Sequence, residues 1–369
     1  NLAGETIAGA FRVDSATGLA LRGRSRRAAR AEDRRRPRQP RRSRRSPVGR
    51  QPAAAGPVLV TRGLEVAFPG AGRPVRGVDL RVGPGEAVGV AGESGSGKSL
   101  TGLAIAQLIE PPGQVAGSVV FMGEELADGR DHGSLLGTSM ALVFQDPNAT
   151  FNPVRRMGWQ LAEVALAHQG LGRRAAFARA VDRLAAVRIA APEQRAHQYP
   201  HEFSGGMRQR AMIGMGLMAK PALIIADEPT TALDMTVQRQ VLDLLDSVRR
   251  QDNVAVVLIS HDISVLSERC ERILVMYAGR VVEELAADDL GRARHPYTRL
   301  LVAAVPDLET DVSAPLAVIP GQPPEPSEVG QGCAFAPRCP LAVARCLADE
   351  PRLEPDGVAC WRPGEEDGP

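Results

Sequence analysis

A glycine-rich loop, Gly92-Glu93-Ser94-Gly95-Ser96-Gly97-Lys98-Ser99, constrains the fold of this chain more than any other feature. It follows an apolar run at 87–91 and precedes a helix-favouring stretch at 100–108. Glycines let successive backbone N–H groups turn inward around phosphate oxygens, and a helix N-terminus adds positive potential. Lys98 would contact the β- and γ-phosphates, and Ser99 would offer a hydroxyl to Mg²⁺. The loop therefore predicts a nucleoside triphosphate site made by Gly92, Ser94, Gly95, Ser96, Gly97, Lys98 and Ser99.

Short β-branched runs alternate with helical stretches on both sides of this loop. The predicted strands are 87–91, 118–122, 141–144, 222–226, 255–260 and 273–277. The run at 222–226 is apolar without alternation, which is typical of a central strand covered on both faces. Alternating strands and helices indicate an α/β fold with a mainly parallel sheet. The segment at about 150–205 is rich in Ala, Leu and Arg and is predicted to be a helical insertion.

The N-terminal segment differs in composition from the rest. Residues 1–56 contain 15 arginines and four acidic residues without apolar periodicity, so we predict a disordered tail. A contact with anionic lipid or RNA, an organelle transit peptide, a fragment and an over-extended reading frame are the alternatives. The remainder of the chain is acidic, which argues against a nucleic-acid-binding body. We find no apolar run of about 18 residues and no signal peptide, and we expect the chain to reach a membrane only through a partner.

Two adjacent carboxylates end the apolar strand predicted at 222–226. Asp227 and Glu228 come directly after this run, and Pro229 follows them. A strand end directs its last side chains toward a nucleotide held at the same edge of the sheet. Asp227 is therefore expected to hold Mg²⁺, and Glu228 is expected to orient or deprotonate the attacking water.

The stretch Phe203-Ser204-Gly205-Gly206-Met207-Arg208-Gln209-Arg210 resembles the signature of ABC ATPases. Other motifs of that family fall in order around it. The matching positions are Phe68 (adenine contact), Gln145 (Q-loop, a Mg²⁺ ligand that couples nucleotide state to the membrane partner), Ala232-Leu233-Asp234 (D-loop) and His261 (switch histidine). The resemblance implies that Ser204, Gly205, Gly206 and Asp234 complete the ATP site of an opposite subunit, and that Glu228, His261 and Gln145 are catalytic.

The C-terminal sequence narrows the resemblance to one group within that family. The segments His295-Pro296-Tyr297-Thr298-Arg299 and Gly332-Cys333…Arg338-Cys339-Pro340 are similar to the tails of oligopeptide/dipeptide/nickel importer ATPases, and the signature is similar to their D-type subunits. The implied organisation is an ABC ATPase domain at 57–292, with an antiparallel β-subdomain and the helical insertion, followed by a small, separate, cysteine-containing region at 293–369.

The resemblance implies a peripheral ATPase on the cytoplasmic face of a bacterial membrane, using ATP and Mg²⁺ to drive peptide import. Its implied partners are a second, related ATPase, two membrane-embedded permeases and, indirectly, an extracytoplasmic binding protein. Import of nickel or another small solute is the nearest alternative. DNA-repair and translation ATPases share the signature, but they carry long insertions or tandem domains that this chain lacks.

Four cysteines gather near the C-terminus, at Cys333, Cys339, Cys346 and Cys360. In a reducing cytosol such a group indicates a metal site rather than disulfides. Four thiolates suit Zn²⁺ or an iron–sulfur cluster, but zinc sites usually contain pairs at C-x2-4-C, which are missing here. The resemblance favours a [4Fe–4S] cluster with a structural role. Zinc, or no metal at all, remains the alternative.

Overall fold

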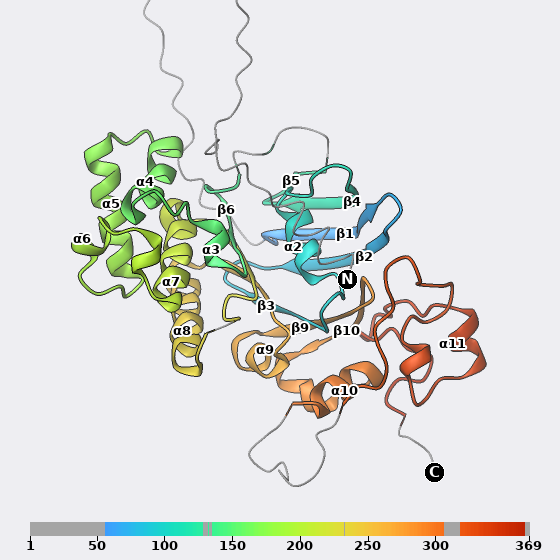
Figure 1. Cartoon of the computed structure of the whole chain (residues 1–369). Coiled ribbons are helices and arrows are strands. Elements are labelled where there is room, and N and C mark those ends of the chain that lie inside the picture. The colour runs from blue at the N-terminus through green and yellow to red at the C-terminus, as the bar shows by residue number, and fades with distance from the viewer. Residues whose placement is uncertain (1–55, 128–131, 133–134, 232, 306–317, 366–369) are drawn as a thin grey trace, which may run out of the picture. The chain divides into compact units, whose positions relative to one another are not determined.

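The structure, a computed structural model, describes residues 56–127, 132, 135–231, 233–305 and 318–365 (Figure 1). The tail predicted at 1–56 thus lies outside the described residues, except for Gly56, and Ala232 of the D-loop also lies outside them. The strands are β1 (Leu59–Phe68), β2 (Gly72–Val82), β3 (Ala87–Ala91), β4 (Gln114–Phe121), β5 (Glu124–Glu125), β6 (Met140–Val143), β7 (Leu223–Asp227), β8 (Ala255–Ile259), β9 (Arg272–Tyr277) and β10 (Arg280–Ala286). The α-helices are α2 (Lys98–Ile105), α3 (Pro147–Thr150), α4 (Met157–His168), α5 (Arg173–Ala186), α6 (Pro192–Arg195), α7 (Gly205–Gly216), α8 (Met235–Asp252), α9 (Ile263–Arg269), α10 (Pro296–Ala303) and α11 (Ala344–Ala348).

The central sheet has six strands in the order β10-β9-β3-β8-β7-β6. Five of them run parallel, and β10 pairs antiparallel with β9. Every residue of β3 is buried, and its alternate residues enter two different hydrophobic clusters. Ala87 and Ala91 belong to one cluster, whereas Val88 and Val90 belong to the other. The sheet is therefore covered on both faces, which confirms the predicted α/β fold with a mainly parallel sheet.

A second sheet is antiparallel, with the order β2-β1-β4-β5. The strand predicted at 118–122 is β4 and belongs here, paired with β1. Leu64 of β1 and Val78 of β2 join Ile105 of α2 and Ile225 of β7 in one buried cluster. This sheet therefore packs over α2, the helix that follows the glycine-rich loop.

The insertion between β6 and β7 is helical, as predicted, and no strand occurs between residues 147 and 216, all of which the structure describes. Figure 1 shows α4, α5 and α6 lying together beside α7. Buried Leu161 of α4 and Leu184 of α5 supply part of the apolar contact. Within the described residues, no helix combines the length and the apolar character needed to cross a bilayer.

The C-terminal region is small and contains the four cysteines, but it is not separate from the core. Tyr297 of α10 and Phe335 are buried with 0% and 1% exposure, and both belong to the cluster that contains Ile273 of β9. Our prediction of a separate appendage was therefore wrong. The proline-rich sequence has little regular secondary structure, yet its aromatic side chains complete the core beside β9 and α10.

Candidate functional site

The glycine-rich loop connects the carboxyl end of β3 to α2, and two of its glycines have no room for a side chain. Gly92 has a φ of 145°, and a Cβ there would lie 2.3 Å from the Met276 carbonyl oxygen. Gly97, the residue before α2, has a φ of 99°, and its Cβ would lie 2.4 Å from the Pro74 carbonyl oxygen. These positions accept only glycine because the backbone is left-handed and the neighbouring strands are close.

Lys98 is folded back into the loop. Its side-chain Nζ donates to the carbonyl oxygens of Gly92 and Glu93, each at 2.8 Å. The residue is only 5% exposed, and burial lowers the pKa of Lys98, partly offset by the nearby carboxylates of Glu228 and Asp227. Lys98 thus places a poorly solvated cation beside the backbone of the glycine-rich loop, as a phosphate site requires.

Ser99 and Asp227 meet across the site. The Ser99 hydroxyl donates to Asp227 Oδ1 at 3.0 Å, although 128 residues separate them in sequence. Burial raises the pKa of Asp227 to about 6, against the lowering effect of the Ser99 hydrogen bond and Lys98. A hydroxyl and a poorly solvated carboxylate are oxygen ligands that suit Mg²⁺, and a bound cation would stabilise the ionised form of Asp227.

Three polar side chains converge on one oxygen of Glu228. Glu228 Oε2 lies 3.1 Å from Gln145 Nε2, 2.9 Å from Thr231 Oγ1 and 3.3 Å from His261 Nδ1. These side chains follow β6, β7 and β8, whose carboxyl ends meet at this edge of the sheet. Glu228 also has a φ of 44°, which is uncommon for a residue with a Cβ. Strained backbone at a carboxylate held from several sides is typical of a catalytic position.

The signature residues lie at the start of α7. The Ser204 hydroxyl caps the helix and accepts a hydrogen bond from Met207 N at 3.3 Å. Asp234 caps α8 in the same way, accepting from Val237 N at 2.9 Å. Gly206 packs where the two helices meet, since its Cβ would lie 2.2 Å from Val237 Cγ1. The N-terminus of α7, capped by the neutral Ser204 hydroxyl, can bind an anion.

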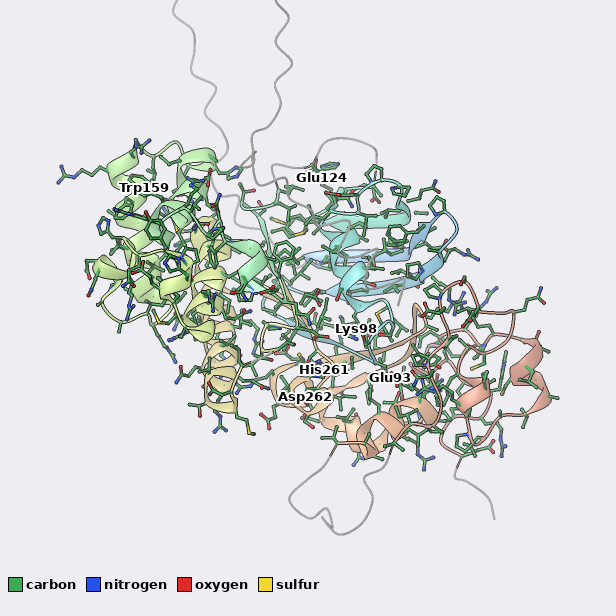
Figure 2. The ribbon with its side chains drawn as sticks, in the orientation of Figure 1. Glu93, Lys98, Glu124, Trp159, His261 and Asp262 are labelled. Atoms are coloured by element: carbon green, nitrogen blue, oxygen red, sulfur yellow. The ribbon has the colours of Figure 1, made fainter. Side chains whose placement is uncertain are left out.

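The structure does not bring the signature residues to the loop of the same chain. Among the described residues, no hydrogen bond or ion pair joins Ser204, Gly205, Gly206 or Asp234 to residues 92–99. Figure 2 labels Lys98, Glu93 and His261 in one region of the molecule, apart from Trp159 of the insertion. The predicted residues of the ATP site therefore fall into two groups. The loop group lies around residues 92–99 and His261, and the signature group consists of Ser204, Gly205, Gly206 and Asp234.

Phe68 ends β1, and its ring is half-buried against the antiparallel sheet. A Cβ on Gly113 would lie 2.8 Å from its Cε1. No hydrogen bond can mark the predicted adenine contact of an aromatic ring, so that role stays a prediction. The hairpin that carries Phe68 leads into Pro74, which touches the phosphate loop at Gly97.

The four C-terminal cysteines line a single cavity of about 20 Å³. None of these four described cysteines forms a disulfide, and burial raises the pKa of Cys333 to about 11 and also raises that of Cys360. Within the described residues, no three His, Cys, Asp or Glu side chains are close enough to hold one metal ion. The four cysteines therefore share a cavity, and their placement favours neither of the two predicted metal sites, the iron–sulfur cluster or zinc.

Sequence reasoning missed several residues of this site. Thr231 was overlooked, although it lies three residues after Glu228, where a turn brings its hydroxyl back to the carboxylate. Arg338 and Tyr297 were noted only as parts of a resemblance, yet they contact the loop residue Glu93. The signal for Glu93 was its position inside the loop, where a carboxylate beside bound phosphates requires a partner.

Comparisons with known proteins agree with this geometry. The profile of the family described as "ABC transporter" matches residues 75–231, and that described as "Oligopeptide/dipeptide transporter, C-terminal region" matches residues 282–346. A probable peptide ABC transporter ATP-binding protein of Sinorhizobium fredii is 43% identical over 320 residues, which cover 84% of this chain and 96% of the relative. The oligopeptide transport ATP-binding protein OppD of Salmonella typhimurium is 42% identical, with 85% and 96% covered.

Two further comparisons add a dipeptide relative and a solved structure. The dipeptide transport ATP-binding protein DppD of Escherichia coli is 44% identical, over 79% of this chain and 90% of the relative. Among solved structures, a dimeric ATP-binding cassette in a post-hydrolysis state with ADP and Pi aligns with a TM-score of 0.56 and 26% identity. That alignment covers 62% of this chain and 98% of the cassette.

Proposed function

Because this chain belongs to the ABC transporter family, in its oligopeptide/dipeptide group, we propose that it drives the import of oligopeptides or dipeptides by hydrolysing ATP. The observation that carries the catalytic part is the convergence of Gln145, Thr231 and His261 on Glu228, beside Lys98. The peptide part is supported by the names of relatives more than 40% identical. Import of nickel or another small solute is the alternative within the same family.

The residues of the loop group have distinct roles in this proposal. Backbone N–H groups of residues 92–97 and the start of α2 bind the phosphates, and Lys98 turns its ammonium from the two carbonyls toward them. Ser99, Asp227 and Gln145 are the groups that would hold Mg²⁺, which neutralises charge on the β- and γ-phosphates. Glu228 orients or deprotonates the attacking water.

The partners of Glu228 fix its carboxylate. Thr231 and Gln145 donate hydrogen bonds to Oε2 and hold the carboxylate toward the nucleotide. His261 is 61% exposed and lies 3.3 Å from the same oxygen, so it can move between this carboxylate and a γ-phosphate. Loss of the γ-phosphate would return His261 to Glu228, which gives the site a means of reporting hydrolysis.

A second ATPase subunit completes the site in this proposal. The signature group, Ser204, Gly205, Gly206 and Asp234, makes no hydrogen bond to the described loop of its own chain, yet it presents a capped helix N-terminus suited to phosphate. The solved cassette with 26% identity is dimeric. We expect this chain to pair with a related but different ATPase. Two ATP molecules would then bind between the chains, and the signature group of each chain would complete the ATP site of the other.

The helical insertion is proposed to bind a permease at the cytoplasmic face of the membrane. Gln145 precedes the insertion, and α3 at its entry contacts the signature helix through Asn148 and Arg208. Val154, 78% exposed, lies in the same entry segment and offers apolar surface to a partner. Crosslinks from the two permeases should therefore fall near residues 151–153 and the insertion, and crosslinks that cluster instead on the Arg-rich tail or the cysteine-containing region would contradict this placement. An extracytoplasmic binding protein would deliver the peptide.

We also propose that Cys333, Cys339, Cys346 and Cys360 hold a [4Fe–4S] cluster. The four thiols share one cavity, and four cysteine thiolates are the usual ligands of such a cluster. The cluster would supply a structural crosslink, since residues 318–365 contain only one short α-helix, α11. None of the proposed catalytic side chains lines this cavity.

Two variants test the ATP site in the assembled transporter. Lys98→Ala should lose ATP binding or turnover, because it removes the buried cation. Glu228→Gln should bind ATP but lose about 10²-fold or more in kcat, because an amide cannot accept the water proton. Lys220→Gln and Glu124→Gln are matched controls, and Figure 2 shows Glu124 apart from Lys98. Wild-type turnover by Glu228→Gln would refute the assignment.

A further inference from the structure

The carboxylate of Glu93, in the middle of the phosphate loop, is held by an arginine from the C-terminal region. Arg338 Nη1 lies 2.7 Å from Glu93 Oε2, and Nη2 lies 3.0 Å from Oε1, so the contact is two-pronged. The side chains are only 4% and 25% exposed. A planar, two-pronged pair shielded from water is stronger and better defined than a surface ion pair.

Other contacts hold Arg338 in this position. Its Nε donates to the Pro320 carbonyl oxygen at 2.7 Å, and Nη1 also donates to the Tyr277 hydroxyl at 3.3 Å. The guanidinium lies 5.9 Å from the ring centroid of buried Phe335. Arg338 is therefore fixed by the C-terminal region and by β9, and it presents its free edge to the loop.

The backbone of Glu93 is held as firmly as its side chain. Glu93 N donates to the Tyr297 hydroxyl at 2.8 Å, and the Glu93 carbonyl oxygen accepts from Lys98 Nζ at 2.8 Å. Thus Arg338 and Tyr297 fix the residue against which Lys98 rests. A shift of Glu93 would move the carbonyl that positions the phosphate-binding ammonium.

Charge gives a second reason for the contact. Lys98 is already surrounded by Asp227, Glu228 and Glu93, all of which act on its pKa. A triphosphate entering this site meets three carboxylates, and an unpaired Glu93 would repel it in a region of low dielectric. Arg338 neutralises the carboxylate that lies inside the loop itself, leaving Asp227 and Glu228 for Mg²⁺ and water.

We propose that Arg338 is a positioning residue for ATP binding, which acts by holding and neutralising Glu93. Arg338 precedes Cys339, a residue of the cysteine-lined cavity, and Arg338 links this part of the C-terminal region directly to the phosphate loop. ATP affinity thereby depends on a correctly folded C-terminal region. The inference rests on the proposed ATP site, and Lys98→Ala tests that site separately.

The test measures KM for ATP and kcat in the assembled transporter. Arg338→Gln should raise KM about fivefold or more while kcat changes less than about twofold, because binding is lost rather than chemistry. Adding Glu93→Gln should recover at least half of the lost affinity, because no unpaired carboxylate then faces the phosphates. Arg294→Gln is the matched control. Arg294 also forms an ion pair within the C-terminal region, 2.9 Å from Asp356, without contacting the loop, so KM should stay at the wild-type value.

A merely structural role predicts a different pattern. If Arg338 only stabilised the fold, the double variant would bind ATP no better than Arg338→Gln, and that result would overturn the proposal. An unchanged KM in Arg338→Gln would overturn it too. If Arg338→Gln does not fold, Arg338→Lys carries the test, since it keeps the charge without the two-pronged contact. We expect Arg338→Lys to raise KM about two- to threefold, and a wild-type KM would refute the proposal. Normal ATP binding and turnover by Lys98→Ala would instead refute the site itself.

Discussion

Replacing Asp227 by asparagine should stabilise the nucleotide-free protein while it removes a proposed magnesium ligand. Burial raises the pKa of Asp227 from 3.8 to about 6. The folded protein therefore binds this proton more tightly than the unfolded chain, and this contribution to stability is lost as pH rises through about 6. Asparagine removes the buried charge and keeps an oxygen that can accept from the Ser99 hydroxyl.

The size of the effect follows from the shift. A difference of about two pKa units corresponds to about 3 kcal/mol at pH 7.5, where both forms of the chain have lost the proton. At pH 5 the folded wild type is still largely protonated at Asp227, so the advantage of the variant falls to about 1.5 kcal/mol. Asp227→Asn should thus be more stable than the wild type, and by more at pH 7.5 than at pH 5.

Urea unfolding of the protein without nucleotide or Mg²⁺, at pH 5 and pH 7.5, measures this difference. Asp182→Asn, on the exposed face of α5, is the control and should match the wild type at both pH values. The same Asp227→Asn preparation should show weaker Mg²⁺-dependent ATP hydrolysis. If the variant is less stable than the wild type at pH 7.5, or if its advantage does not grow between pH 5 and 7.5, the argument from burial fails.

Two further predictions concern packing and metal. Gly206→Ala should lower the free energy of unfolding by about 1–3 kcal/mol, because its Cβ would lie 2.2 Å from Val237 Cγ1. Gly205→Ala makes only a 3.7 Å contact and should match the wild type. Equal stability of the two variants in urea would contradict this prediction. Protein purified anaerobically should be brown and hold about four iron atoms per chain, which Cys339→Ser should lower and Cys270→Ser, outside the cavity, should not. Stoichiometric zinc, or no metal, would refute the cluster.

The sequence predicted those parts of the site whose chemistry is carried by residues that are close together in the chain. The glycine-rich loop, the carboxylates at the end of β7 and the helix start at Ser204 are local patterns, since each needs only a few neighbouring residues to form. The meeting of the loop with the carboxylates at one edge of the sheet followed from parallel strands, and the structure brings Ser99 to Asp227 and His261 to Glu228 accordingly.

Contacts between distant segments could not be predicted in this way. Nothing in the spacing of residues shows that Arg338 would reach Glu93, because the segment before Arg338 is proline-rich and lacks the periodicity that orients a helix or strand. The same lack of periodicity led us to expect a separate appendage. The C-terminal region instead packs against the core through two buried aromatic residues, Tyr297 and Phe335. Their burial follows from the folded structure and from no local sequence pattern.

The position of β3 in the central sheet has a consequence for synthesis on the ribosome. β3 lies between β8 and β9, and Ala87 pairs with Val256 and Val88 with Arg272. These partners emerge about 170 residues later, which at about 5–20 residues per second leaves β3 without neighbours for roughly 10–35 s. All five residues of this strand are apolar or glycine. The nascent polypeptide thus exposes an unpaired apolar strand for much of its translation. A chaperone that binds this segment would prevent aggregation until β8 and β9 are made and the phosphate loop can form.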